Sequence, residues 1–407
     1  MSLWITAAVT AMALLIAGEL AARRWIRARS HYYVWQPWRR MVLHPRASLF
    51  PQVEPHARFE VNAVGERGGA PPRAGDDVFR VLVAGGSSVE CLVLDQPTSW
   101  PGVLERRLNE EPNRRLLGAH RVHVGNIGRS GIESRHLDLI FERLLPQYGR
   151  LDAILIMTGA ADVIFWLEQG APMPLPAVPV RESDAFAQHP AQTFQWRPKR
   201  LAAVELARRA GRPWLRLVEV RRNGGLWIEE TRAKRSAATA LRTAIPDPTP
   251  VIDRFELHFR RLLRRAQEHA DHVIVMRQPW FEKEYTPEER THFWHGGIGR
   301  AWKEPISEFY SLEVVNRLMG LIDERAARVA DELDIPHVDL RRTISPGLDH
   351  FYDYLHFTPR AAALAAEEAA AALLDRVAPA KLEPTVPGAS RRTRPAWTGF
   401  SAQREHR

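Results

Sequence analysis

The sequence predicts a three-layer α/β/α sandwich around a parallel sheet, preceded by one N-terminal transmembrane helix. Three observations support this prediction. Short runs rich in Val, Ile and Leu alternate with amphipathic helical patterns, the first such run ends in two glycines and two serines, and a long apolar stretch stands at the N-terminus. Strands that alternate with helices are typical of a parallel sheet covered on both faces.

The N-terminal residues 3–22 are apolar apart from Thr6, Thr10 and Glu19, and they match the ~20 residues that a bilayer-spanning helix needs. No basic residue precedes this run, four arginines follow it by position 29, and no small-residue cleavage site is evident. This pattern favours an uncleaved anchor over residues 1–30 rather than a removable signal peptide. The arginines favour a cytoplasmic body under the positive-inside rule, which is statistical, so the membrane side is left open.

Residues 31–77 are rich in Pro, Gly and Arg and are predicted to form a juxtamembrane linker, of which 31–40 is typical of a membrane-interface collar. The globular domain is expected over residues 78–377, with an insertion without sheet rhythm at about 165–250 and a helical candidate at 199–210. A basic, disordered tail is expected over 378–407. The strands are expected at 81–84, 121–128, 152–158, 272–280 and 335–340, and the helices at 97–110, 133–147, 251–270, 312–333 and after 358.

The composition of the 407 residues, 45% hydrophobic and 26% charged, excludes a disordered or fibrous class. The single cysteine, Cys91, excludes an internal disulfide and a cysteine-rich zinc site, and we interpret it as a small apolar residue near the sheet. The net charge of +9 invites a nucleic-acid partner. We expect none, because the arginines are dispersed and no helix-turn-helix, zinc-finger or RNA-binding signature accompanies them.

A serine at the end of the first strand is a candidate catalytic residue. Gly85 and Gly86 end that strand and place Ser87 at the carboxyl edge of the sheet, where ligands of this architecture bind. Asp353 and His356 stand three residues apart before the last helix and can reach the same edge. A serine becomes a nucleophile when a histidine takes its proton and a carboxylate fixes that histidine. The bland alternatives are a glycine-rich turn that binds phosphate or merely turns, and an Asp-x-x-His pair that caps a helix.

Acyl transfer also needs N–H donors aimed at a developing oxyanion. Gly128, in the loop after the second strand, has no side chain, so its amide can approach an oxyanion closely, and Ser87 can donate from its own amide. Asp162 is expected to shape the loop after the third strand. No set of His, Asp and Glu residues has metal-ligand spacing, so no metal is expected.

Four blocks in this order resemble the SGNH or GDSL hydrolase superfamily: Gly85–Ser87, Asn126–Gly131, Gly159–Asp162 and Asp353–His356. The similarity covers about residues 79–162 and 272–374 and implies a flavodoxin-like sheet, a serine esterase or acyltransferase of a membrane-anchored bacterial type, and no cofactor. It also implies Ser87 as nucleophile, Asp353 and His356 as the rest of a catalytic triad, and Gly128 as an oxyanion donor.

One position departs from the family pattern. The family places an asparagine side chain in the oxyanion hole where this chain has Ala161. The resemblance makes an O-acetylated carbohydrate or a lipid the expected substrate. Three residues are candidate substrate contacts. His295, in a glycine-rich aromatic loop, could form a substrate wall or lid or lie in an ordinary exposed loop; Arg129 could face an anionic substrate or be a solvated side chain; Ala161 is the third. Because of Ala161, the alternative is a retired hydrolase that serves as a membrane-tethered glycan-binding or scaffold component. The oligomeric state is left open.

Overall fold

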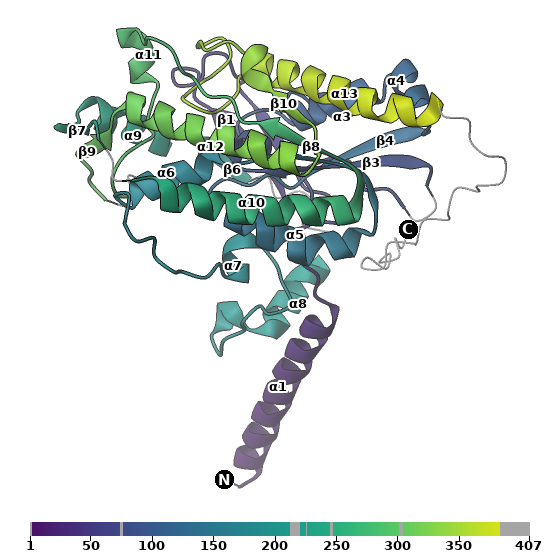
Figure 1. The fold of residues 1–407 in the computed structure, drawn as a ribbon. Coiled ribbons are helices and arrows are strands. Elements are labelled where there is room, and N and C mark those ends of the chain that lie inside the picture. The colour runs from purple at the N-terminus through teal and green to yellow at the C-terminus, as the bar shows by residue number, and fades with distance from the viewer. Residues whose placement is uncertain are drawn as a thin grey trace.

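The computed structural model describes residues 2–73, 76–211, 220–224, 226–244, 247–300 and 304–382. Figure 1 shows a layered body at the end of one long helix, α1 (Ser2–Arg29). The last helix, α13, ends at Leu382, so most of the tail predicted to be disordered lies outside the described residues.

The body is built on a five-stranded parallel sheet with the strand order β10-β8-β5-β3-β4. From β3 the chain moves outward to β4 and then returns to the other side of β3, which is the flavodoxin-like order. The predicted fold class and all five predicted strands are therefore confirmed. Their bounds are β3 Val78–Gly85, β4 Arg121–Asn126, β5 Leu151–Met157, β8 Ala270–Arg277 and β10 His337–Asp339.

Helices cover both faces of this sheet (Figure 1). One face carries α3 (Trp100–Leu108), α4 (Glu111–Leu117) and α13 (Pro359–Leu382), and the other carries α5 (Ser134–Tyr148), α6 (Ala160–Glu168), α10 (Thr249–His269) and α12 (Leu312–Glu332). Their apolar residues recur at helical spacing: on α10, Phe255 and Phe259 are both buried and their rings stack at 5.1 Å. The continuous apolar runs of the central strands are thus buried between two helical layers.

The segment predicted as a linker is folded onto the body. Val34 and Trp35, from the predicted membrane collar, are buried in the main core, whereas Trp38 stays exposed. Strand β1 (Arg40–Pro45) pairs antiparallel with β2 (Ala57–Glu60) and parallel with β6 (Val220–Gly224). Residues 31–77 are therefore not a free linker, because their few apolar side chains find partners in the body.

The predicted insertion starts inside α6 and spreads over the surface of the body. Helix α7 (Glu182–Ala185) packs on α5, α8 (Ala202–Gly211) on α1, and α9 (Leu226–Ser236) on α11 (Pro287–Thr291). Strand β7 (Ala240–Arg242) pairs with β9 (Glu308–Tyr310). The short helices η1 (Pro198–Arg200) and η3 (Leu340–Arg342) complete the described elements outside the nucleophile turn.

The exposed part of α1 agrees with the predicted anchor. Residues Trp4–Arg29 are long and apolar enough to cross a membrane, and most of this stretch is not covered by the rest of the chain. Length and composition are weak evidence, since a signal sequence meets the same test.

Candidate active site

Ser87, Asp353 and His356 meet at the carboxyl edge of the sheet, although the serine and the histidine are 269 positions apart in the chain. The Nε2 atom of His356 lies 2.8 Å from Ser87 Oγ, and its Nδ1 atom lies 2.7 Å from Asp353 Oδ2. When Nδ1–H donates to the carboxylate, Nε2 is free to accept the serine proton. The structure thus brings together the three residues that the sequence predicted as a triad.

The turn that carries Ser87 depends on the glycine at position 85, where a side chain would clash with the backbone of β5. Helix α2 (Ser87–Glu90) begins at the serine itself, directly after β3. A Cβ on Gly85 would stand 2.0 Å from the Met157 carbonyl oxygen and 2.6 Å from a methyl group of Val89. The amides of Val89 and Glu90 donate to the Gly86 carbonyl, so the Ser87 amide precedes the first hydrogen bonds of the helix and is left for a ligand.

Asp353 is buried and held as a carboxylate by four N–H groups. Its Oδ1 accepts from the amides of Leu355 (2.8 Å) and His356 (2.9 Å), while Oδ2 accepts from the Trp294 indole (2.9 Å) and from His356 Nδ1. Burial acts to raise the pKa of this carboxyl, but His356 and the Leu355 amide hold the pKa well below its ordinary value. The carboxylate therefore stays charged at neutral pH and orients the imidazole.

Aromatic rings lie close to His356. The rings of Tyr352 and Trp294 are each inclined 8° to the imidazole, with centroids 5.4 and 6.3 Å away. His295 stacks on Trp294 at 3.7 Å and is only 3% exposed. Burial lowers the pKa of His295 to about 3, so this imidazole is neutral. The predicted wall residue His295 thus lies beside the triad, inside the protein rather than on an exposed lid.

The same three groups could in principle hold a metal. Ligand atoms of His295, Asp353 and His356 lie within 4.8 Å of one another. However, both ring nitrogens of His356 already face Ser87 and Asp353, so this histidine is engaged in hydrogen bonds with them.

Gly128 has a different role from the one predicted. Its amide donates to Asn126 Oδ1 at 2.7 Å, and the Asn126 side-chain amide donates to the Val89 carbonyl at 2.8 Å. A Cβ on Gly128 would stand 2.5 Å from the Glu90 nitrogen. The prediction that this amide binds the oxyanion is therefore wrong in this structure, because the amide is already used. The glycine is needed for close packing against α2.

The remaining predicted contacts are placed as follows. Arg129 donates to the Ala185 carbonyl at 3.0 Å, and its guanidinium lies 5.9 Å from the Trp35 ring centroid, so it ties α7 and the lead-in to the site. Ala161 is the half-buried second residue of α6 and offers only its backbone. Asp162 accepts from the Ser134 amide (2.9 Å) and hydroxyl (2.6 Å), which fixes the start of α5 and agrees with a shaping role.

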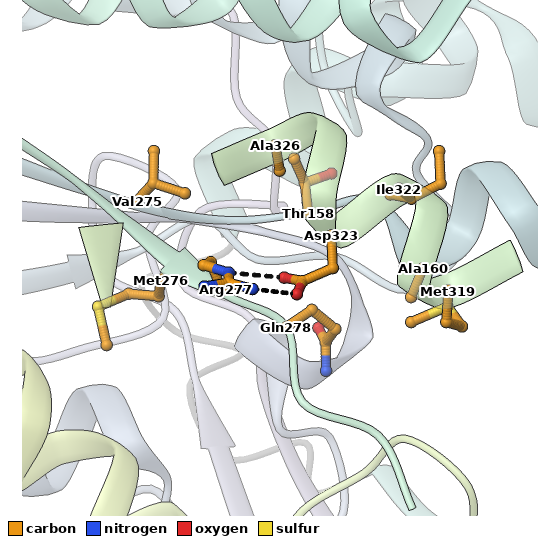
Figure 2. Close-up of a pocket in the computed structure, with 10 residues that line it drawn as sticks. All are labelled: Thr158, Ala160, Val275, Met276, Arg277, Gln278, Met319, Ile322, Asp323 and Ala326. Carbon is orange, nitrogen blue, oxygen red and sulfur yellow. Dashed lines mark hydrogen bonds and ion pairs between the residues drawn. The ribbon is translucent and has the colours of Figure 1, made fainter. Parts of the chain in front are cut away.

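A small pocket opens next to this edge, between β8, α6 and α12 (Figure 2). The Arg277 guanidinium pairs with Asp323 in it, with 2.9 Å between Nε and Oδ1. Gln278, at its border, donates from Nε2 to Ser88 Oγ at 3.1 Å, so the pocket wall contacts the residue after the nucleophile. Ala160, from the first turn of α6, lines the same pocket.

Sequence reasoning missed three residues that shape the site. Trp294 holds Asp353, as described above. Arg232 of α9 donates to the carbonyls of Leu49 (3.1 Å), Tyr352 (2.7 Å) and His292 (3.0 Å), and Trp35 donates from Nε1 to the Gly128 carbonyl at 2.9 Å. The sequence signal for Trp294 was its place beside His295, but spacing alone does not show which ring faces the carboxylate.

No protein-family model and no curated protein sequence matches the chain. Solved structures similar to it include the acetylxylan esterase Axe2 from Geobacillus stearothermophilus, with 14% identity over 75% of this chain and 95% of that chain and a TM-score of 0.37. A member of the lipolytic G-D-S-L family from Veillonella parvula is 10% identical over 71% of this chain and 95% of that chain, with a TM-score of 0.38. LAE5, an α/β hydrolase from the metagenome of Lake Arreo, is 13% identical over 74% of this chain and 98% of that chain, with a TM-score of 0.38.

Proposed function

We propose that this chain is a serine esterase or acyltransferase of the SGNH/GDSL type, which forms an acyl-enzyme on Ser87. The observation that supports this proposal most strongly is the continuous hydrogen-bonded relay from Ser87 through His356 to the buried Asp353. The four N–H groups around Asp353 make the relay preorganised, which is the condition for general-base activation of a serine.

In the proposed mechanism, His356 Nε2 takes the Ser87 proton as Oγ attacks the ester carbonyl. The tetrahedral intermediate collapses when the imidazolium gives this proton to the leaving alcohol, and the acyl group remains on Ser87. Water or a sugar hydroxyl, deprotonated by His356, then attacks the acyl-enzyme; the bond between Ser87 Oγ and the acyl group breaks, and the imidazolium returns the proton to Oγ. Asp353 stabilises the imidazolium in both steps.

The oxyanion needs donors other than Gly128. In the loop after β4, the amides of Gly128, Arg129 and Ser130 are bonded to Asn126, to the Gly85 carbonyl and to Glu90. The next residue, Gly131, is exposed, and its amide has no acceptor among the described residues. We therefore assign the oxyanion to the amides of Ser87 and Gly131, with the first-turn backbone of α6 at Ala161 in place of the family's asparagine side chain.

The proposed substrate is an O-acetylated carbohydrate or a lipid ester presented near a membrane. The anchor α1 is compatible with both, since a tethered enzyme can work on a cell-surface glycan or on the bilayer itself. The second candidate function is a retired hydrolase that binds glycans, which the side chain missing at Ala161 favours.

The test is turnover of p-nitrophenyl acetate by the full chain in detergent, compared with Ser87→Ala, His356→Ala and the control Ser88→Ala. Ser88 is the buried neighbour of the nucleophile and bonds to Leu355 and Gln278 rather than to the relay. We expect a loss on the order of 10⁴-fold in the first two variants and little change in the third. Turnover that survives in Ser87→Ala would refute the nucleophile, whereas an inactive parent that fails to label with a fluorophosphonate would favour the glycan-binding alternative.

A further inference from the structure

The end of α1 nearest the body packs against α8 through a buried charge. Glu19, the one carboxylate within the apolar run, is 4% exposed. Its two oxygens accept from the Ala202 and Ala203 amides at 2.8 and 2.9 Å, and Arg23 donates to it at 2.8 Å. Glu19 therefore caps the N-terminus of α8 and ties this helix to α1. Figure 1 shows α8 beside the end of α1 that joins the body.

The point where α8 begins to cover α1 places this contact at the membrane surface. Residues 4–18 of α1 are exposed, and Glu19 is the first residue of this stretch that the rest of the chain covers. If α1 spans a membrane, its uncovered stretch lies in the hydrocarbon core, and the boundary of that core nearest the body lies at the level of Glu19. At this level α1 already contacts α8, because Ala22 and Ile26 are buried with Phe194 and Ala202.

The exposed residues of the segment 194–211 have the composition of a headgroup contact. Trp196 is 59% exposed and Val204 is 37% exposed. Three cations, Arg197, Lys199 and Arg200, are exposed around η1, and Arg23 lies over the Trp196 ring at 4.5 Å. Exposed aromatic and aliphatic side chains next to a cluster of basic groups are what an anionic lipid surface binds.

We propose that residues 194–211 form an interfacial platform that lies on anionic phospholipid headgroups and holds the catalytic body at a fixed height and tilt above the bilayer. The proposal rests on α1 as a membrane span and goes beyond the esterase assignment. The platform restrains rotation of the body about the end of α1, so the carboxyl edge with Ser87 keeps one orientation relative to the lipid surface.

The test measures contact between the platform and lipid in the full chain. The variant Val204→Cys carries an NBD fluorophore on the new cysteine. The control variant, Leu257→Cys, carries the same fluorophore on α10; the Leu257 side chain is 49% exposed and lies far along the chain from the platform. The parent protein, treated with the same fluorophore, serves as the blank, because its only cysteine, Cys91, is buried. Both labelled proteins are reconstituted in phosphatidylcholine vesicles with and without about a third phosphatidylglycerol. The quencher is doxyl-labelled lipid in both leaflets, so quenching does not depend on which side of the vesicle membrane the body faces.

We expect strong quenching at position 204 in the phosphatidylglycerol vesicles and weak quenching at position 257. The triple variant Arg197→Glu, Lys199→Glu, Arg200→Glu should lower the quenching at 204 to the level of the control site. Equal quenching at positions 204 and 257 would overturn the platform. Quenching at position 204 that is the same with and without phosphatidylglycerol, and the same in the triple variant, would overturn the recognition of anionic headgroups. Resistance of the protein to an alkaline wash of the vesicles tests the span itself, and esterase turnover in detergent tests the catalytic proposal separately.

Discussion

Replacement of Trp294 by Phe tests how far the relay depends on a residue outside the triad. The Trp294 indole donates to Asp353 Oδ2 at 2.9 Å, on the oxygen that also faces His356 Nδ1. Phe keeps a ring to pack beside His356 but removes the donor. We expect kcat to fall while KM changes little, because the lost contact orients the imidazole and does not bind substrate.

The magnitude follows from the bonds that remain. A hydrogen bond to a charged group contributes about 1.5–3 kcal/mol, and each 1.36 kcal/mol of activation free energy is tenfold in rate. Asp353 keeps its other N–H donors, the amides of Leu355 and His356 and His356 Nδ1, so the lower end applies and the loss in kcat is about tenfold. The assay is p-nitrophenyl acetate turnover over a range of pH, with denaturant unfolding in parallel.

Trp280→Phe is the matched control. Trp280 is as deeply buried as the site itself, but its indole N–H has no hydrogen-bond partner among the described residues. This variant should therefore lose packing and some stability without a selective loss of kcat. Equal losses of kcat in the two variants, or an unchanged kcat in Trp294→Phe, would refute the positioning role of Trp294.

Three further predictions concern the support of the site. Arg67→Met should cost about 3 kcal/mol in urea unfolding, because the carbonyls of Glu90 and Leu94 near α2 would lose their guanidinium donor, while the Cys91 carbonyl would keep the Leu94 amide; an unchanged midpoint would contradict this. Gly85→Ala should cost about 1–3 kcal/mol or more because of its clash with the Met157 carbonyl, whereas Gly86→Ala, with open space around its Cβ, should be nearly neutral. Burial raises the pKa of Asp162 from 3.8 to about 6, so the folded chain holds a proton that the unfolded chain releases, and this group's contribution to stability falls as pH rises from about 4 to about 6. Asp162→Asn should remove this decline. Free energies of unfolding that change with pH in the same way for both proteins between about pH 4 and about pH 6 would contradict this prediction.

The triad could be predicted from sequence because each member stands at the end of an element that the hydrophobic pattern identifies. Ser87 follows a buried strand, and Asp353 and His356 precede the last helix. Parallel strands bring their carboxyl ends to one edge, and the resemblance of the four blocks to the SGNH or GDSL superfamily singled out these three residues at that edge. The role of Gly128 was not predictable in this way, because the pattern does not tell which of several successive amides in a loop turns toward Asn126 and which toward a ligand.

The lead-in failed as a prediction for a different reason. Pro, Gly and Arg are abundant both in free linkers and in irregular segments that pack on a body, so the composition of residues 31–77 does not separate the two. Burial of Val34 and Trp35 is decided by partners far away in the chain, such as the Gly128 carbonyl that accepts from Trp35. Trp294 has the same difficulty, since its role depends on the direction of one ring.

Two buried arginines from outside the blocks that resemble the hydrolase superfamily hold the two halves of the relay. Arg67, from the lead-in, bonds the carbonyls of Glu90, Cys91 and Leu94 at the end of the nucleophile helix. Arg232, from the insertion, bonds the Tyr352 carbonyl next to Asp353. Carbonyls at a helix end and in a tight turn have no partner of their own, and a guanidinium with five donors can satisfy several at once. Because the serine side is fixed from one added segment and the acid side from the other, the distance between Ser87 Oγ and His356 Nε2 depends on both. The lead-in and the insertion are therefore part of the framework that positions Ser87 and His356, even though the family resemblance does not extend to them.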